Sequence, residues 1–151
     1  MIELDQTDRA LLRALREDAT LATGELGRRL GLSQPAAWRR LKRLTESGVL
    51  AGRRLVLDRE ALGFGVTVFL GIKLATKGRV SLDEFERAAA AIPEVQTIEH
   101  VLGLYDYRLR VVARDLSDFE RVLRRRIMTL PGAGNVEANV LMSEERLAGP
   151  L

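Results

Sequence analysis

The chain has 151 residues and a net charge of +3; 46% of its residues are hydrophobic and 30% are charged. This balance predicts a folded, soluble chain of one large or two small domains, and no apolar stretch approaches the roughly 18 residues of a membrane span. The chain has no cysteine and a single histidine, which excludes disulfides and thiol catalysis and argues against a histidine-built metal site. We therefore expect no cofactor, no metal and no membrane contact, and a cytoplasmic location because no secretory signal is visible.

The positive charge is concentrated in the N-terminal third. Residues 1–54 contain 11 Lys or Arg against 7 Asp or Glu, whereas residues 55–151 contain 13 against 14. A local excess of cations suggests a polyanion as the partner of this part of the chain. A solvated helix face without a partner can show the same excess, so the charge needs a structural context.

The first fifty residues carry apolar residues at helical spacing, with capping residues at the expected places. Residues 4–18 are predicted to form a helix that Asp5 caps, and residues 23–31 a second, short helix followed by Gly31. Ser33 is predicted to cap a third helix that ends before residue 48. Two helices joined by such a short, Gly-containing turn are typical of a helix-turn-helix, whose second helix enters the major groove of DNA.

The third helix has two distinct faces when its residues are placed on a wheel at about 100° per residue. The apolar face, expected to pack on the first two helices, consists of Ala37, Leu41 and Leu44. Trp38 borders that face and is predicted to be a packing residue that braces the helix, with stacking on DNA as the alternative. The opposite face is predicted to carry Ala36, Arg39 and Arg43 toward DNA, with Arg40 and Lys42 on its flanks. The predicted DNA-binding residues are Ser33, Gln34, Ala36, Arg39, Arg40, Lys42, Arg43, Arg53 and Arg54. The alternative is a three-helix bundle whose basic face is only solvated.

A change of pattern follows the third helix. "VLAGRRLVLD", residues 49–58, alternates enough to predict two short strands, as a wing or an interdomain strand that carries Arg53 and Arg54. The two glycines of "DREALGFG" then indicate a boundary. The predicted domains are residues 1–58 and residues 66–151, joined by a linker at residues 59–65.

The second half alternates strands and helices. The predicted elements are a strand at 66–75, a helix from Ser81 to Ile92, strands at 95–103 and 105–113, a helix from Ser117 to Ile127 that begins with the capping box "SDFE", and a strand at 135–142. The order β-α-β-β-α-β is that of a ferredoxin-like domain, so the predicted fold class is α+β. Two helices cover one face of such a sheet, and a second copy of the chain is the simplest cover for the other. We therefore expect a homodimer at least.

The ordered series of motifs resembles the Lrp/AsnC family, the feast/famine transcription regulators, over nearly the whole length. The resemblance rests on "LDQTDRALLRALRED", "ELGRRLGLSQPAAWRRLKRLTESGVLAG", "LGFGVTVFLGI", "GLYDYRLRV" and "LPGAGNVEANVLM". It implies an N-terminal winged helix-turn-helix that binds double-stranded DNA. It also implies a C-terminal ferredoxin-like domain that dimerises through its sheet, assembles further to an octamer, and responds to an amino acid or a related small metabolite.

The resemblance also implies an effector site around one turn and the last strand. Gly103 and Asp106 match the family's Gly-x-x-Asp turn, where the carboxylate could bind an ammonium group and backbone N–H groups a carboxylate. The predicted effector-binding residues are Gly103, Leu104, Tyr105, Asp106, Val136 and Ala138. Leu104 replaces a residue that is more often polar, and Val136 and Ala138 replace a frequent Thr-x-Thr pair. A different ligand, weaker binding, no ligand, or an ordinary β-turn therefore stays open.

The two alternative classes of function are an enzyme and an architectural DNA-binding protein. Siroheme decarboxylases resemble this family in architecture, but their His-Asn-Tyr-type motif is missing, because His100 is followed by Val101 and Leu102. An architectural, nucleoid-type protein that wraps DNA with little sequence preference is compatible with the sequence. The sequence favours a sequence-specific transcription regulator that is not an enzyme.

Overall fold

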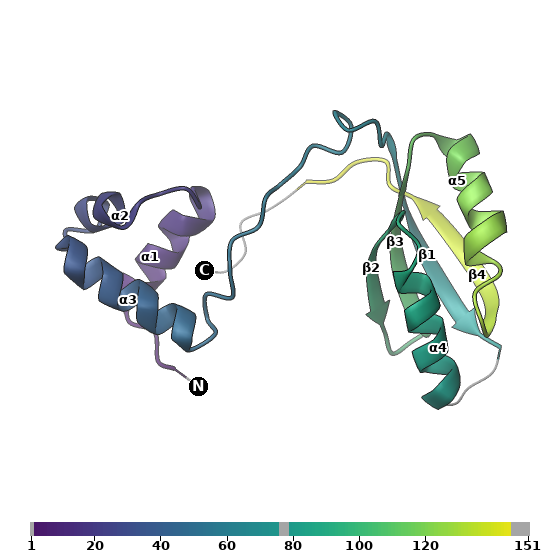
Figure 1. Cartoon of the computed structure of the whole chain (residues 1–151), viewed down its shortest axis with the longest axis horizontal. Helices are drawn as coiled ribbons and strands as arrows, with labels where there is room; N and C mark the ends of the chain where they lie inside the picture. The colour runs from purple at the N-terminus through teal and green to yellow at the C-terminus, as the bar shows by residue number, and fades with distance from the viewer. Residues whose placement is uncertain (1, 76–78, 146–151) are drawn as a thin grey trace. The chain divides into compact units, whose positions relative to one another are not determined.

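The structure is a computed structural model that describes residues 2–75 and 79–145. The described residues divide into two compact units, residues 2–56 and 57–145 (Figure 1). Each unit has its own hydrophobic core. The predicted second domain continues to Leu151, and its residues 146–151 lie outside the described part. Among the described helices, none is both long and apolar enough to cross a membrane.

The first unit is a bundle of the three predicted helices. These are α1 (Gln6–Glu17), α2 (Thr23–Arg29) and α3 (Gln34–Glu46). Asp5 caps α1 as predicted: its carboxylate accepts the N–H of Asp8 at 2.7 Å, and the Asp8 carboxylate accepts the N–H of Asp5 at 3.2 Å. Ser33 caps α3 by accepting the N–H of Ala36 at 3.4 Å. The core between the helices is made of leucines, namely Leu11, Leu12, Leu15, Leu21, Leu26 and Leu44.

The turn between α2 and α3 is tight because two glycines allow it. Gly31 follows α2 with a φ of 66°, a left-handed conformation that favours glycine. Gly27 lies against the incoming chain: a Cβ on this residue would lie 2.8 Å from the carbonyl oxygen of Leu32. The N–H of Leu32 donates to the carbonyl of Gly27 at 2.8 Å, which closes the turn. This geometry confirms the predicted helix-turn-helix.

The strands predicted for residues 49–58 do not form in the described chain. Residues 51–58 have no regular structure, and Leu55 is 90% exposed. An isolated two-stranded hairpin is marginal in water unless it packs on other elements. The alternating pattern was therefore not sufficient to form the predicted wing within this one chain.

The second unit has the predicted β-α-β-β-α-β order. Its elements are β1 (Val66–Leu74), α4 (Arg79–Ala90), β2 (Val95–His100), β3 (Tyr107–Ala113), α5 (Leu116–Val122), the π-helical turn η1 (Leu123–Ile127) and β4 (Ala133–Val140). The sheet has the strand order β2-β3-β1-β4, and all its pairings are antiparallel. The ferredoxin-like α+β fold is confirmed.

The helix starts in this unit differ from the predicted ones. The described part of α4 begins at Arg79, so Ser81 lies inside the helix and not at the position that precedes it. The cap of α5 is Asp115 in place of Ser117, and its carboxylate accepts the N–H of Asp118 at 2.7 Å. A carboxylate at this place also interacts favourably with the positive end of the helix dipole.

The two faces of the sheet have different environments. On one face, side chains of β1 pack with α4 and α5 in a single core that includes Val68, Leu70, Ile72, Phe85, Ala89, Phe119 and Val122. The alternate residues of β1 point to the other face, which we call the open face, because side chains alternate along a strand. On the open face the Arg110 guanidinium lies 5.4 Å from the centre of the Phe69 ring, and it pairs with Glu144 at 3.2 Å. No described helix covers this face.

Candidate nucleic-acid interface

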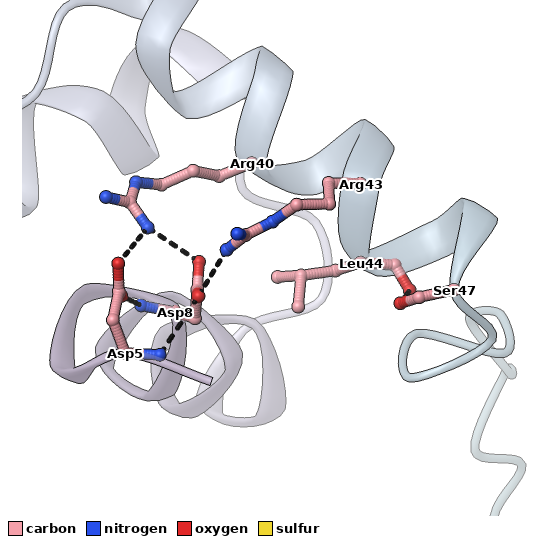
Figure 2. Close-up of polar contacts among 6 residues, drawn as sticks. All are labelled: Asp5, Asp8, Arg40, Arg43, Leu44 and Ser47. Carbon is pink, nitrogen blue, oxygen red and sulfur yellow. Dashed lines mark hydrogen bonds and ion pairs between the residues drawn. The ribbon is translucent and has the colours of Figure 1, made fainter. Parts of the chain in front are cut away.

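Two of the four cations of α3 are turned back toward the start of α1. Arg40 Nη1 lies 2.6 Å from Asp5 Oδ2 and 2.8 Å from Asp8 Oδ1, and Arg43 pairs with the other oxygen of Asp8 (Figure 2). Asp8 is fully buried, whereas both arginines stay partly exposed. We call these four residues, Asp5, Asp8, Arg40 and Arg43, the Asp8 cluster. The cluster fixes the orientation of α3 relative to α1.

The directions in which the pKa values of Asp5 and Arg40 shift agree with this geometry. The N–H of Asp8 and then the Arg40 guanidinium lower the pKa of Asp5, since both hydrogen bonds favour the carboxylate. The same Asp5 and Asp8 carboxylates raise the pKa of Arg40. The prediction that Arg43 points outward is therefore wrong in part, because its guanidinium is held by Asp8. A helical wheel of α3 alone contains no information about a buried carboxylate on α1.

The other two cations, Arg39 and Lys42, point away from the core. Arg39 is exposed, and among the described residues it forms no hydrogen bond or ion pair. Lys42 Nζ lies 3.7 Å from Glu46 and 5.3 Å from the centre of the Trp38 ring. These side chains leave a positively charged surface on α3 that could bind phosphates or base edges.

Trp38 is 53% exposed, so the prediction that it packs in the bundle is wrong. The buried residues of α3 are Ala37 and Leu44, which lie on one side of the helix. Trp38 is one step of about 100° beyond Ala37, at the edge of the surface that α1 and α2 cover. Within the described residues of the first unit, no helix or strand besides these three is present to cover the indole.

The other predicted DNA-binding residues are distributed over two segments. Ser33 and Gln34 are exposed at the start of α3, with the Ser33 hydroxyl used as its cap, and Ala36 is half-buried. Arg53 and Arg54 are exposed in the irregular segment after the bundle. The helix α3 therefore carries six of the nine predicted positions, and its N-cap is a seventh. Their contact with DNA remains a prediction.

Asp106, the central residue of the predicted effector turn, is bound to the end of β1. Its carboxylate accepts the N–H of Leu74 at 2.9 Å and lies 3.1 Å from Lys73 Nζ. Its own N–H donates to the carbonyl of Ile72 at 3.0 Å. A ligand ammonium would have to replace Lys73 at this carboxylate. Gly103, by contrast, is exposed at the tip of the turn with a φ of 156°.

Tyr105 lies across β1 on the open face. A Cβ on Gly71 would lie 2.6 Å from two carbons of the Tyr105 ring, so glycine is required for this contact. The Tyr105 hydroxyl donates to the Glu137 carboxylate, which raises the pKa of Tyr105 and lowers the pKa of Glu137. The sequence analysis missed Glu137 and Lys73, because 32 and 33 residues separate them from their partners.

The predicted effector residues of β4 face the other way. Val136 pairs with Ile72 and Ala138 with Leu70, so both side chains share the face of the helix-covered core. The exposed Leu104 belongs to the turn. The structure thus does not bring the six predicted effector residues to one surface within a single chain. In the described residues, no cluster of three His, Asp or Glu side chains could hold a metal ion.

Two family profiles match the chain, one for each unit. The profile described as the AsnC-type helix-turn-helix domain matches residues 4–45, and the profile of the Lrp/AsnC ligand binding domain matches residues 67–149. Among curated relatives, the proline dehydrogenase transcriptional activator of Rhizobium radiobacter is 35% identical over 147 residues. That alignment covers 97% of this chain and 94% of the relative.

Solved structures are similar over the whole chain. An AsnC family transcriptional regulator from Agrobacterium tumefaciens superposes with a TM-score of 0.87 at 32% identity, and the match covers 98% of this chain and 96% of the other. A transcriptional regulator of Neisseria meningitidis in complex with L-Met has a TM-score of 0.90 at 25% identity, with 99% and 96% covered.

Proposed function

Because the chain belongs to the Lrp/AsnC family of transcription regulators, we propose that it binds double-stranded DNA through the exposed side of α3. The observation that carries this proposal is that two cations of α3 pair with carboxylates of α1, whereas the other two lie on the exposed side of the helix. Arg40 and Arg43 orient the helix through the Asp8 cluster, whereas Arg39 has no partner among the described residues and Lys42 lies beside it on the exposed side. The relatives are regulators of transcription, and the chain is likewise a regulator and not an enzyme.

The test compares Arg39→Ala with a matched loss of charge elsewhere. The full-length protein first selects a duplex from a randomised 20-base-pair library, and its affinity for that duplex is then measured by fluorescence anisotropy over a range of salt concentrations. Arg39→Ala should weaken binding and, if Arg39 contacts a phosphate, reduce the slope of log K against log salt by about 1. Arg87→Ala, an exposed change on α4, is the control and should leave the affinity and the salt slope unchanged.

Equal effects of Arg39→Ala and Arg87→Ala would contradict the proposal that α3 binds DNA.

Footprinting of the parent on random DNA distinguishes a sequence-specific regulator from an architectural DNA-binding protein. Discrete protected sites support a sequence-specific regulator, whereas uniform coverage would support an architectural protein that wraps DNA.

We propose that an amino acid or a related small metabolite modulates this binding through the turn at residues 101–106. The match to a ligand binding domain and the L-Met complex of the Neisseria meningitidis relative support the proposal. A ligand at 100 times its Kd stabilises the native state by about 2.7 kcal/mol. Thermal unfolding with each amino acid and its keto acid should therefore reveal at least one ligand. Asp106→Asn should lose the ligand-induced rise in unfolding temperature, and the exposed control Asp83→Asn should keep it. A parent protein whose unfolding temperature rises with none of the compounds would contradict the proposal.

We also propose a homodimer in the cytoplasm that forms through the open face of the sheet and assembles further to an octamer. The open face supports this because no described helix covers it and Phe69 lies on it beside Arg110. Light scattering after size-exclusion chromatography should give at least twice the mass of one chain. Phe69→Glu should shift the protein to a monomer because it places a charge in the interface. A monomeric parent at micromolar concentration would contradict the dimer.

A further inference from the structure

The exposed side of α3 carries a stripe of three side chains. Gln34, Trp38 and Lys42 are spaced by four residues, so they lie above one another on one side of the helix, and all three are exposed. We call them the Trp38 stripe. The Lys42 ammonium lies over the indole face at 5.3 Å, which orients both side chains by a cation–π contact. Arg39 is next to this stripe.

The indole of Trp38 is half exposed, and tryptophan is enriched at interfaces because it combines a large apolar ring with a polar N–H. This suggests that the indole contacts a partner. The neighbours of Trp38 indicate which partner. The stripe is accompanied by cations, Lys42 and Arg39, whereas the buried centre of a protein–protein interface is depleted in charge. The excess of Lys and Arg over Asp and Glu in residues 1–54 has the sign that suits a polyanion. These observations favour DNA over a protein surface.

We propose that Trp38 is a base-contacting residue that reads the C5-methyl group of a thymine in the major groove. The thymine methyl is the apolar group that a base edge presents in that groove, and a flat apolar ring on a recognition helix is suited to contact it. Lys42 and Arg39 lie beside the ring, where they can contact the phosphates that border the groove. This inference rests on the proposed DNA binding. It goes beyond it by assigning to Trp38 a role in recognising the base sequence.

The first experiment uses Trp38 as its own reporter, since it is the only tryptophan of the chain. Emission of the full-length protein is recorded during titration with the duplex selected from the randomised library. Anisotropy of a dye on the duplex reports binding independently. We expect the emission maximum to move to shorter wavelength as the indole leaves water. Binding without any change in emission would overturn the contact but leave the DNA-binding function intact, whereas failure to select any duplex would overturn the function itself.

The second experiment removes the methyl group alone. Each thymine of the selected duplex is replaced in turn by uracil, which pairs in the same way but lacks the C5-methyl. At one position we expect a loss of about threefold to fivefold in affinity for the parent, the effect of one buried methyl group. Trp38→Ala should bind the thymine and uracil duplexes equally well. Leu116→Ala, an exposed apolar change on α5, is the matched control and should keep the full uracil effect.

The variant is expected to fold, because Trp38 lies outside the core of the first unit. Far-UV circular dichroism of Trp38→Ala should match the parent. A uracil effect of equal size in the parent and in Trp38→Ala would show that another residue reads the methyl group. Absence of a uracil effect at every position in the parent would also overturn the proposal.

Discussion

Asp8 is the only fully buried charged side chain in the described part of the chain. A buried carboxylate is costly unless it is paired, and here Arg40 and Arg43 approach its two oxygens from α3. The two arginines keep contact with water, so the pairing neutralises Asp8 without burying their charges. At the scale of single residues, the orientation of α3, the helix that we propose binds DNA, thus depends on one buried carboxylate of α1.

We expect Asp8→Asn to lower the free energy of unfolding of the first unit by about 2–4 kcal/mol, since it removes the buried partner of two guanidinium groups. Urea denaturation followed by the fluorescence of Trp38 measures this change. Asp83→Asn, an exposed position, serves as the control. A variant at Asp8 that unfolds at the same urea concentration as the parent would show that the cluster does not stabilise the bundle.

The lowered pKa of Asp5 predicts a dependence on pH. A carboxyl whose pKa is lower in the folded state contributes stability above its unfolded pKa, and this contribution is lost as the pH falls through the folded pKa. The first unit should therefore lose stability as the pH falls below about 4. Thermal unfolding between pH 2 and pH 7 should show a weaker acid dependence for Asp5→Asn than for the parent. Identical curves would contradict the assignment.

At the scale of elements, the turn between α2 and α3 depends on a close backbone approach. Gly27 lies where a Cβ would lie 2.8 Å from the carbonyl oxygen of Leu32, and this oxygen belongs to the backbone and cannot rotate away. Gly71 plays a comparable part in β1, where the missing Cβ leaves room for the Tyr105 ring. Both glycines make room for a neighbour from outside their own element.

We expect Gly27→Ala to destabilise the first unit by about 1–3 kcal/mol, because α2 and the turn must move apart to accept the methyl group. The same variant should weaken binding to the selected duplex, since the movement displaces the start of α3. Gly24→Ala is the matched control, because a Cβ on Gly24 would make only ordinary contacts at 3.7 Å with Gln34. Equal stability of the two variants would contradict the close approach.

At the scale of the molecule, residues 2–75 and 79–145 contain two separate hydrophobic cores. The leucine core of the first unit includes Leu11 and Leu44, and the core of the second includes Leu70 and Phe85. The chain also has a natural optical probe for each unit. The single tryptophan is in the first unit, and both tyrosines, Tyr105 and Tyr107, are in the second.

Each unit should therefore unfold according to its own core. Leu11→Ala should destabilise the first unit by about 2–5 kcal/mol and lower the temperature at which tryptophan fluorescence changes, with the near-UV circular dichroism of the tyrosines unaffected. Leu70→Ala should instead destabilise the second unit. It should lower the temperature at which the tyrosine signal changes and leave the tryptophan transition unaffected. If either variant shifted both transitions equally, the chain would unfold as one cooperative unit.

The sequence by itself determined the features that depend on neighbours along the chain. Asp5 and Ser33 could be identified as caps, residues 23–46 as a helix-turn-helix, and residues 66–140 as a ferredoxin-like order of elements, because capping and periodicity are local signals. The alternation in residues 49–58 misled the prediction because a hairpin also needs a surface to pack on. Only the tertiary structure decided which cations of α3 are free and that Trp38 is exposed. It also placed Val136 and Tyr105 on opposite faces of the sheet. The positions of Arg43 and Tyr105 depend on partners more than 30 residues away, Asp8 and Glu137, and the exposure of Trp38 depends on which elements cover α3. A helical wheel or a strand pattern contains only the element itself.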